Sequence, residues 1–280
     1  MPSEPTAAEI TRKAKSNLAF ALKCVPPDRR EHLVSFYAFC RVIDDLADDL
    51  DLPIEEKKSG LAGWKAIFDN DTTDPSLGLQ DLQSDILKVR DLYDIPSEYF
   101  ANVIVGCQMD LQPQRFDTWD DLKEYTYRVA SSVGLVCLPL FAADPKRSHD
   151  YAIALGDALQ LTNILRDIGE DLSNGERIYI PLNDLGQFQS TEQDLIAGVH
   201  DDGFTAFMTR QADRCEELYA KATARLPPED HKALLAPRVM HRIYHTLLKK
   251  MREDNFRVFD RRYRLSKLHK IALLAKERFA

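Results

Sequence analysis

Residues 160–181, QLTNILRDIGEDLSNGERIYIP, contain the pattern from which we predict the fold. Asn163, Asp167 and Asp171 are four residues apart, so on an α-helix they lie on one face. Buried carboxylates are unfavourable unless they are paired or bind a cation. We therefore expect a helix that presents three oxygen ligands for a metal ion. Apolar residues occupy most of its remaining circumference, which is typical of a buried helix: Leu159, Leu161, Ile164, Leu165 and Ile168.

A second acidic row occurs in FCRVIDDLADD, residues 39–49. Asp44 and Asp48 are four apart, and two carboxylates so close on a helix repel each other unless a cation lies between them. Taken alone, this row is more typical of a solvated helix face than of a metal site. Arg41, one turn before Asp45, is placed either to neutralise that carboxylate or to contact an anionic ligand.

Oxygen ligands favour a hard cation, and Mg²⁺ commonly takes one or two carboxylates and completes its shell with water and substrate phosphates. Two facing acidic helices with Mg²⁺ between them would form a diphosphate site. The sequence contains no glycine-rich phosphate-binding motif that would offer another way to bind a diphosphate.

Helical periodicity runs through the chain of 280 residues, of which 44% are hydrophobic and only 11 are glycine. We predict one all-α domain over residues 1–280, with residues 1–7 flexible. Asp28 is a candidate N-cap, and Thr118 to Asp121 has the form of a capping box. The expected helices cover residues 8–24, 29–50, 54–69, 79–93, 98–112, 119–142, 147–173, 191–199, 203–225, 229–250 and 266–278.

The net charge of −8 disfavours nucleic acid as a partner. The five cysteines form no CxxC pair, which indicates reduced thiols and a cytoplasmic protein. No signal-peptide core precedes the first helix, and no run of about 18 apolar residues occurs. We expect any membrane contact to be peripheral, and the oligomeric state stays open.

Five ordered blocks of the sequence carry a resemblance to a known family. They are YAFCRVIDDLAD (37–48), YTYRVASSVG (125–134), LTNILRDIGEDLSNGERIYIP (161–181), IYHTLLKKM (243–251) and FDRRYRLS (259–266). With these blocks, the chain resembles the squalene/phytoene synthases, the head-to-head branch of the trans-isoprenyl diphosphate synthases. The resemblance implies a helical bundle around a deep central cavity, with the two aspartate motifs facing each other at its mouth.

The resemblance also assigns roles to individual residues. The implied metal ligands are Asp44, Asp48, Asn163, Asp167 and Asp171. The four aspartates among them, with Tyr125 near the reacting carbons, are the implied catalytic residues. The implied substrate-binding residues are Arg41, Tyr37, Gln160, Asn163, Tyr244 and Arg262 around the diphosphates, and Leu18, Leu22, Val129 and Val133 along the hydrocarbon. In the first helix, KAKSNLAFAL replaces the Ser- and Phe-rich stretch of many relatives.

The implied reaction is the Mg²⁺-dependent condensation of two allylic diphosphates, with Mn²⁺ as a possible substitute metal. Our first interpretation is the condensation of two farnesyl diphosphates, through presqualene diphosphate, to a squalene-type C30 product. The alternatives are a phytoene synthase acting on two geranylgeranyl diphosphates and an enzyme that stops at presqualene diphosphate. NADPH enters only if squalene is released. Two rival classes are a terpene cyclase, which would need only one acidic site, and a helical scaffold, which would need neither.

Overall fold

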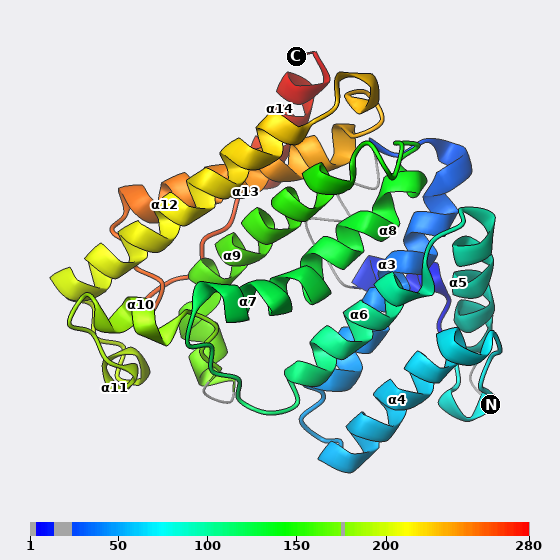
Figure 1. The fold of residues 1–280 in the computed structure, drawn as a ribbon, viewed down its shortest axis with the longest axis horizontal. Helices are drawn as coiled ribbons and strands as arrows, with labels where there is room; N and C mark the ends of the chain where they lie inside the picture. The colour runs from blue at the N-terminus through cyan, green and yellow to red at the C-terminus, as the bar shows by residue number, and fades with distance from the viewer. Residues whose placement is uncertain (1–3, 14–23, 175–176, 280) are drawn as a thin grey trace.

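The computed structural model describes residues 4–13, 24–174 and 177–279, and within them the protein is all-α, as predicted (Figure 1). Those residues contain no strand and one isolated bridge, between Phe116 and Pro181. The predicted Leu18 and Leu22 lie outside the described residues. The principal helices are α1 (Ala7–Lys13), α3 (Pro27–Asp48), α4 (Ile54–Asn70), α5 (Gln80–Leu92), α6 (Ser97–Met109), α7 (Trp119–Thr126), α8 (Ser132–Leu140), α9 (His149–Ser173), α10 (Leu182–Gly186), α11 (Glu192–Ile196), α12 (Asp202–Arg225), α13 (Leu235–Glu253) and α14 (Lys267–Arg278).

Helix α9, which carries the second acidic motif, lies between α12 and α8 in the centre of the molecule (Figure 1). It also packs against α13. Leu161 and Leu165 of α9 are completely buried. A Cβ atom on Gly156 would lie only 2.7 Å from the Cα of Ser131, so glycine at this position permits close packing. The predicted buried helix is therefore confirmed, and it forms the spine on which the site is built.

The predicted helix over residues 119–142 is divided by a π-helical turn at Tyr127–Ser131. The turn is fixed by the buried carboxylate of Asp157 on α9, which accepts hydrogen bonds from the hydroxyls of Thr126 (2.8 Å) and Ser131 (3.2 Å). Such turns often occur at functional sites. Here it joins α7 to α8 beside the cavities described below.

Local sequence signals predicted some helix ends and missed others. Thr118 forms the predicted capping box with Asp121. Asp28 is not the N-cap of α3, because Pro27 already occupies the first helical position and Asp28 lies inside the first turn. The helix expected to begin at residue 229 begins at Leu235, after a short 3₁₀ turn at Pro228–Asp230. The short helix α10 was not predicted.

Candidate active site

A polar cavity of about 240 Å³, which we call the mouth cavity, lies between α3, α6, α7 and α9. It brings together residues that the sequence separates by more than a hundred positions. Seven of the predicted site residues line it: Tyr37, Arg41, Asp44, Tyr125, Val129, Val133 and Gln160. The other lining residues are Cys40, Val103, Cys107 and Asp110.

The first acidic motif faces this cavity from the C-terminal half of α3. Arg41 donates a 2.8 Å hydrogen bond to Asp44 and also pairs with Asp45. Asp44 lines the cavity, and its side chain is 49% exposed. Burial by the surrounding protein and the nearby Asp48 carboxylate nevertheless raise the pKa of Asp44 to about 6. The motif is thus a site where negative charge is crowded and only partly neutralised.

Asp110, directly after α6, connects the first motif to aromatic residues. Its carboxylate accepts hydrogen bonds from the hydroxyls of Tyr125 (2.9 Å) and Tyr179 (2.7 Å). The two phenol rings stack with centroids 5.1 Å apart. Burial is the main reason why the pKa of Asp110 rises to about 6 and why the pKa of Tyr125 is raised well above its usual value. Tyr125 is therefore held as a neutral hydrogen-bond donor next to the predicted metal site.

The second acidic motif lies along α9 and is more deeply buried. The side chain of Asp167 is 15% exposed and pairs with Arg166, whose Nε lies 2.8 Å from Asp167 Oδ1. Arg262 reaches the same carboxylate at 3.2 Å. The pKa of Asp171 rises to about 8 because the carboxyl is buried and close to Asp167. A metal ion would relieve this repulsion.

Arg177 joins the two motifs through the extended segment that follows α9. Its guanidinium donates to Asp48 at 2.9 Å and to the backbone carbonyl of Asp110 at 3.3 Å. Its backbone N–H donates to the carbonyl of Asp171 at 3.1 Å. This one residue therefore ties the end of the second motif to the first.

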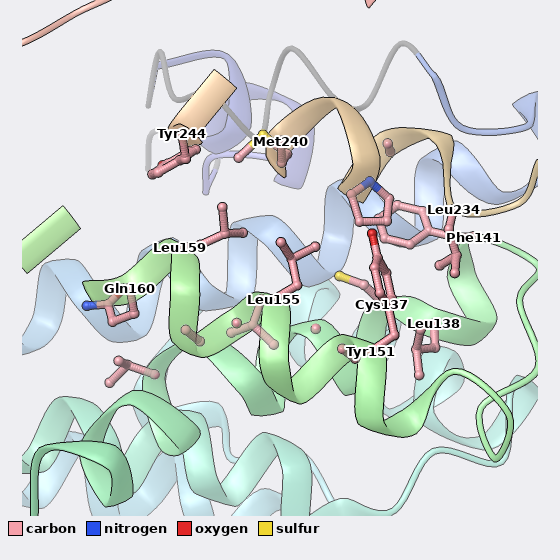
Figure 2. Close-up of a pocket in the computed structure, with 18 of the residues that line it drawn as sticks. Cys137, Leu138, Phe141, Tyr151, Leu155, Leu159, Gln160, Leu234, Met240 and Tyr244 are labelled. Atoms are coloured by element: carbon pink, nitrogen blue, oxygen red, sulfur yellow. The ribbon is translucent and has the colours of Figure 1, made fainter. Parts of the chain in front are cut away.

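An apolar cavity of about 260 Å³, which we call the tail cavity, adjoins the mouth cavity and shares Val129, Val133 and Gln160 with it. Figure 2 shows Gln160 and Tyr244 toward one end, and Leu138 and Phe141 at the other. The remaining wall comes mainly from α8, α9 and the start of α13, through residues that include Cys137, Leu155, Leu159, Leu234, Pro237 and Met240.

Tyr151 of α9 stands at the end of the tail cavity far from Gln160 (Figure 2). Only 2% of the residue is exposed, and its hydroxyl has no hydrogen-bond partner among the described residues. Tyr151 also lines a separate polar cavity of about 420 Å³ that contains Arg238 and Glu277. The phenol is thus a partition between apolar and polar space.

The residues fit a hard divalent cation by their chemistry. The described residues hold no preassembled group of three acidic, His or Cys side chains at metal-binding distance. Mg²⁺ does not require one, because water and substrate phosphates supply much of its shell. The side-chain oxygen of Asn163 is buried without a hydrogen-bond partner among the described residues, as an unused ligand would be. Asp48, Asp167 and Asp171 would complete the set with Asp44.

Sequence analysis singled out most residues of the candidate site but missed three that contact them in the structure. Tyr244, for which we predict a diphosphate contact, lies near the second motif, with the Arg166 guanidinium 6.0 Å from its ring centroid. Arg262 is also brought to that motif. Asp110, Arg177 and Tyr179 were not singled out. Arg177 and Tyr179 belong to the quoted GERIYIP stretch, which could have indicated them. Asp110 is a single aspartate after a helix, and no sequence pattern indicated it.

The profile of the squalene/phytoene synthase family matches residues 11–269. A 15-cis-phytoene synthase of Synechococcus elongatus is 31% identical, over 91% of this chain and 85% of that protein. A presqualene diphosphate synthase of Zymomonas mobilis is 33% identical, over 89% and 84%. A crystal structure of a dehydrosqualene synthase in complex with ligand superposes with a TM-score of 0.80 at 26% identity, covering 98% of this chain and 94% of that one.

Proposed function

Because the chain belongs to the squalene/phytoene synthase family and is a prenyltransferase, we propose that it joins two molecules of geranylgeranyl diphosphate head to head, in the manner of a phytoene synthase. The observation that carries the proposal is the pairing of a charged mouth cavity with an apolar tail cavity, joined through shared residues. An allylic diphosphate has the same two parts.

The choice of a C20 substrate differs from the C15 substrate that we first inferred from the sequence. The relatives named above favour phytoene or presqualene diphosphate as the product over squalene. The tail cavity is also lined by α9 from Tyr151 to Asn163, over which the helix rises about 18 Å. With carbon–carbon bonds of about 1.5 Å in a zigzag, sixteen main-chain carbons extend roughly 19 Å and twelve extend roughly 14 Å. The longer chain of geranylgeranyl diphosphate matches this span.

The first chemical requirement is departure of diphosphate from an allylic carbon. Mg²⁺ bound by the aspartates would neutralise the diphosphate and favour its departure as a Lewis acid. Arg41, Arg177 and Arg262 already lie against those aspartates. They are placed to hold the diphosphate when it displaces their present carboxylate partners, since guanidinium groups bind phosphate oxygens bidentately.

The second requirement is to keep the resulting allylic cation from water. Val129 and Val133 supply apolar wall where the two cavities meet, and Gly134 adds a small residue on the side of the tail cavity. The stacked rings of Tyr125 and Tyr179 lie beside the mouth cavity, where an aromatic face stabilises a nearby cation. Bond formation between the two allylic units, with loss of one diphosphate and one proton, gives a cyclopropylcarbinyl diphosphate. A second ionisation, rearrangement and proton loss gives phytoene without a reductant, so NADPH is not needed.

A second candidate is the condensation of two farnesyl diphosphates that stops at presqualene diphosphate. It is favoured by the 33% identity to the enzyme of that name from Zymomonas mobilis. This reaction needs the same mouth residues and a shorter tail.

Incubation of the protein with geranylgeranyl or farnesyl diphosphate and Mg²⁺, with and without NADPH, tests both candidates when the products are identified by mass. We expect phytoene from the C20 substrate, at the same rate without NADPH. Presqualene diphosphate from the C15 substrate as the dominant product would select the second candidate. A cyclised product containing a single prenyl unit would reject both.

A further inference from the structure

The C-terminal helix α14 presents an unpartnered apolar face to solvent. Leu268 is 80% exposed, Ile271 is 52% exposed and Phe279, which follows the last helical residue, is 88% exposed. Ala272 and Ala275 are exposed between them. At about 100° per residue these positions fall within roughly one third of the circumference. We call this set the outer stripe: Leu268, Ile271, Ala272, Ala275 and Phe279.

The opposite face of α14 is fixed to the protein. Leu273 and Leu274 pack against the core. Glu277, 6% exposed, pairs with Arg238 of α13, which is 7% exposed, and with Arg242 at 2.8 Å. This buried ion pair sets the rotation of the helix, so the outward orientation of the outer stripe follows from packing.

Positive charge borders the outer stripe on both sides. By helical rotation, Lys267 and Arg278 lie along one edge and Lys276 along the other, and all three are exposed. The only acidic residue of the helix is Glu277, which is buried. This arrangement is unusual in a chain whose net charge is −8.

We propose that the outer stripe docks on a lipid surface that contains anionic headgroups. An apolar face flanked by cations is the pattern with which a helix lies in the interface of a bilayer. Nearby cations gain from the negative surface potential of such a membrane, although the protein as a whole is acidic. A second copy of this chain is a poorer occupant, because it would bring Lys267, Lys276 and Arg278 against an identical cationic set.

The position of α14 would bring a docked membrane close to the tail cavity. The helix packs on α13, which supplies Pro237, Met240 and Tyr244 to the tail cavity. One helix therefore separates the outer stripe from the space proposed for an apolar chain. The described residues contain no helix that is both long and apolar enough to cross a bilayer. The proposal does not rest on the proposed reaction.

Co-sedimentation with vesicles tests it. The purified protein is mixed with vesicles of phosphatidylcholine alone or with phosphatidylglycerol added, at low and high salt. We expect binding only with the anionic lipid, and weaker binding at high salt. Leu268→Glu with Phe279→Glu should reduce the partition coefficient at least about tenfold. Lys267→Gln with Lys276→Gln should reduce it about fivefold per lost cation.

Leu92→Glu is the matched control, since Leu92 is 64% exposed at the end of α5 and carries no such flanking pattern. It should bind like the unmodified protein, and all variants should keep its melting temperature. Equal vesicle binding by the Leu268→Glu/Phe279→Glu variant would overturn the proposal, as would absence of binding by the unmodified protein. Sedimentation equilibrium showing a dimer that this double variant dissociates would assign the outer stripe to self-association instead.

Discussion

The mouth cavity and the tail cavity share Val129, Val133 and Gln160 but are built from different chemistry. Two carboxylates line the mouth cavity: Asp44 accepts a hydrogen bond from Arg41, and Asp110 accepts one from the hydroxyl of Tyr125. The tail cavity is lined mostly by aliphatic side chains and ends at a phenol without a hydrogen-bond partner among the described residues. We therefore expect the two cavities to have different roles. Substitutions in the mouth cavity should change the turnover rate, and substitutions in the tail cavity should change the chain length of the substrate that is accepted.

The largest effects are expected for the aspartates of the two motifs, which Arg177 connects next to the mouth cavity. Asp48→Ala or Asp171→Ala should each lower product formation by about 10³-fold or more, because each removes a carboxylate that would bind Mg²⁺, and Mg²⁺ would in turn bind the diphosphate. Steady-state turnover with Mg²⁺ measures this. Asp45→Asn is the control, since Asp45 pairs with Arg41 and is not one of the predicted metal ligands. If a substitution in either motif left turnover unchanged, the inference that both motifs are required would be wrong.

Tyr125 sharpens the comparison, because it contributes both a ring and a hydroxyl. Tyr125→Phe removes the hydrogen bond to Asp110 but keeps the stack on Tyr179. If the hydroxyl orients Asp110, Phe should cost about 10²-fold in turnover, the scale for one preorganised donor. If only the ring acts, Phe should stay active and Tyr125→Ala should not. Rates close to that of the unmodified enzyme in both variants would show that Tyr125 is simply packed there.

Tyr151 tests the tail cavity in the same way. Tyr151→Ala would join the tail cavity to the polar cavity beyond it, so longer allylic diphosphates should gain by about tenfold relative to the C20 substrate. Tyr151→Phe keeps the partition and should leave the preference unchanged. Leu138→Ala, at the same end, is a control that enlarges the cavity without opening it. Competition between C20 and C25 substrates measures the ratio, and an unchanged ratio in Tyr151→Ala would show that the phenol does not limit chain length.

The smallest expected effect concerns stability. Burial and Asp167 raise the pKa of Asp171 to about 8, so the folded protein binds this proton more tightly than the unfolded chain does. The stability present below about pH 4 is therefore lost as the pH rises through about 8. In chelator at pH 8.5, Asp171→Asn should raise the free energy of unfolding by about 1–2 kcal/mol relative to the unmodified protein, a value reduced for solvent screening, and the gain should be small at pH 4.5. A gain that is independent of pH would contradict the shifted pKa.

The sequence predicted the mouth far better than the tail, for a physical reason. Carboxylates four residues apart on a helix are visible in one segment, so Asp44, Asp48, Asp167 and Asp171 could be found without a fold. Apolar wall residues look like any other core residues, because burial leaves the same pattern whether they face a cavity or another helix. Arg177 reaches Asp48 across 129 positions of the chain, and no local pattern encodes that contact.

The far end of the tail cavity shows the same limit. Tyr151 is aromatic and buried, which predicts a core position, and only the structure reveals that its hydroxyl has no partner among the described residues and separates two cavities. The π-helical turn at Tyr127–Ser131 was also not predicted, since it depends on Asp157 from another helix. Tertiary contacts decided both features.

The most direct test of the account is the number of substrates that one chain holds. Equilibrium binding of a thio-analogue of geranylgeranyl diphosphate, which cannot ionise readily, should be measured with Mg²⁺ and with chelator. Our interpretation, that both aspartate motifs serve one head-to-head reaction, predicts two analogue molecules per chain with Mg²⁺ and a large loss of affinity with chelator. Saturation at one analogue molecule per chain would contradict it and would favour the chemistry of a cyclase.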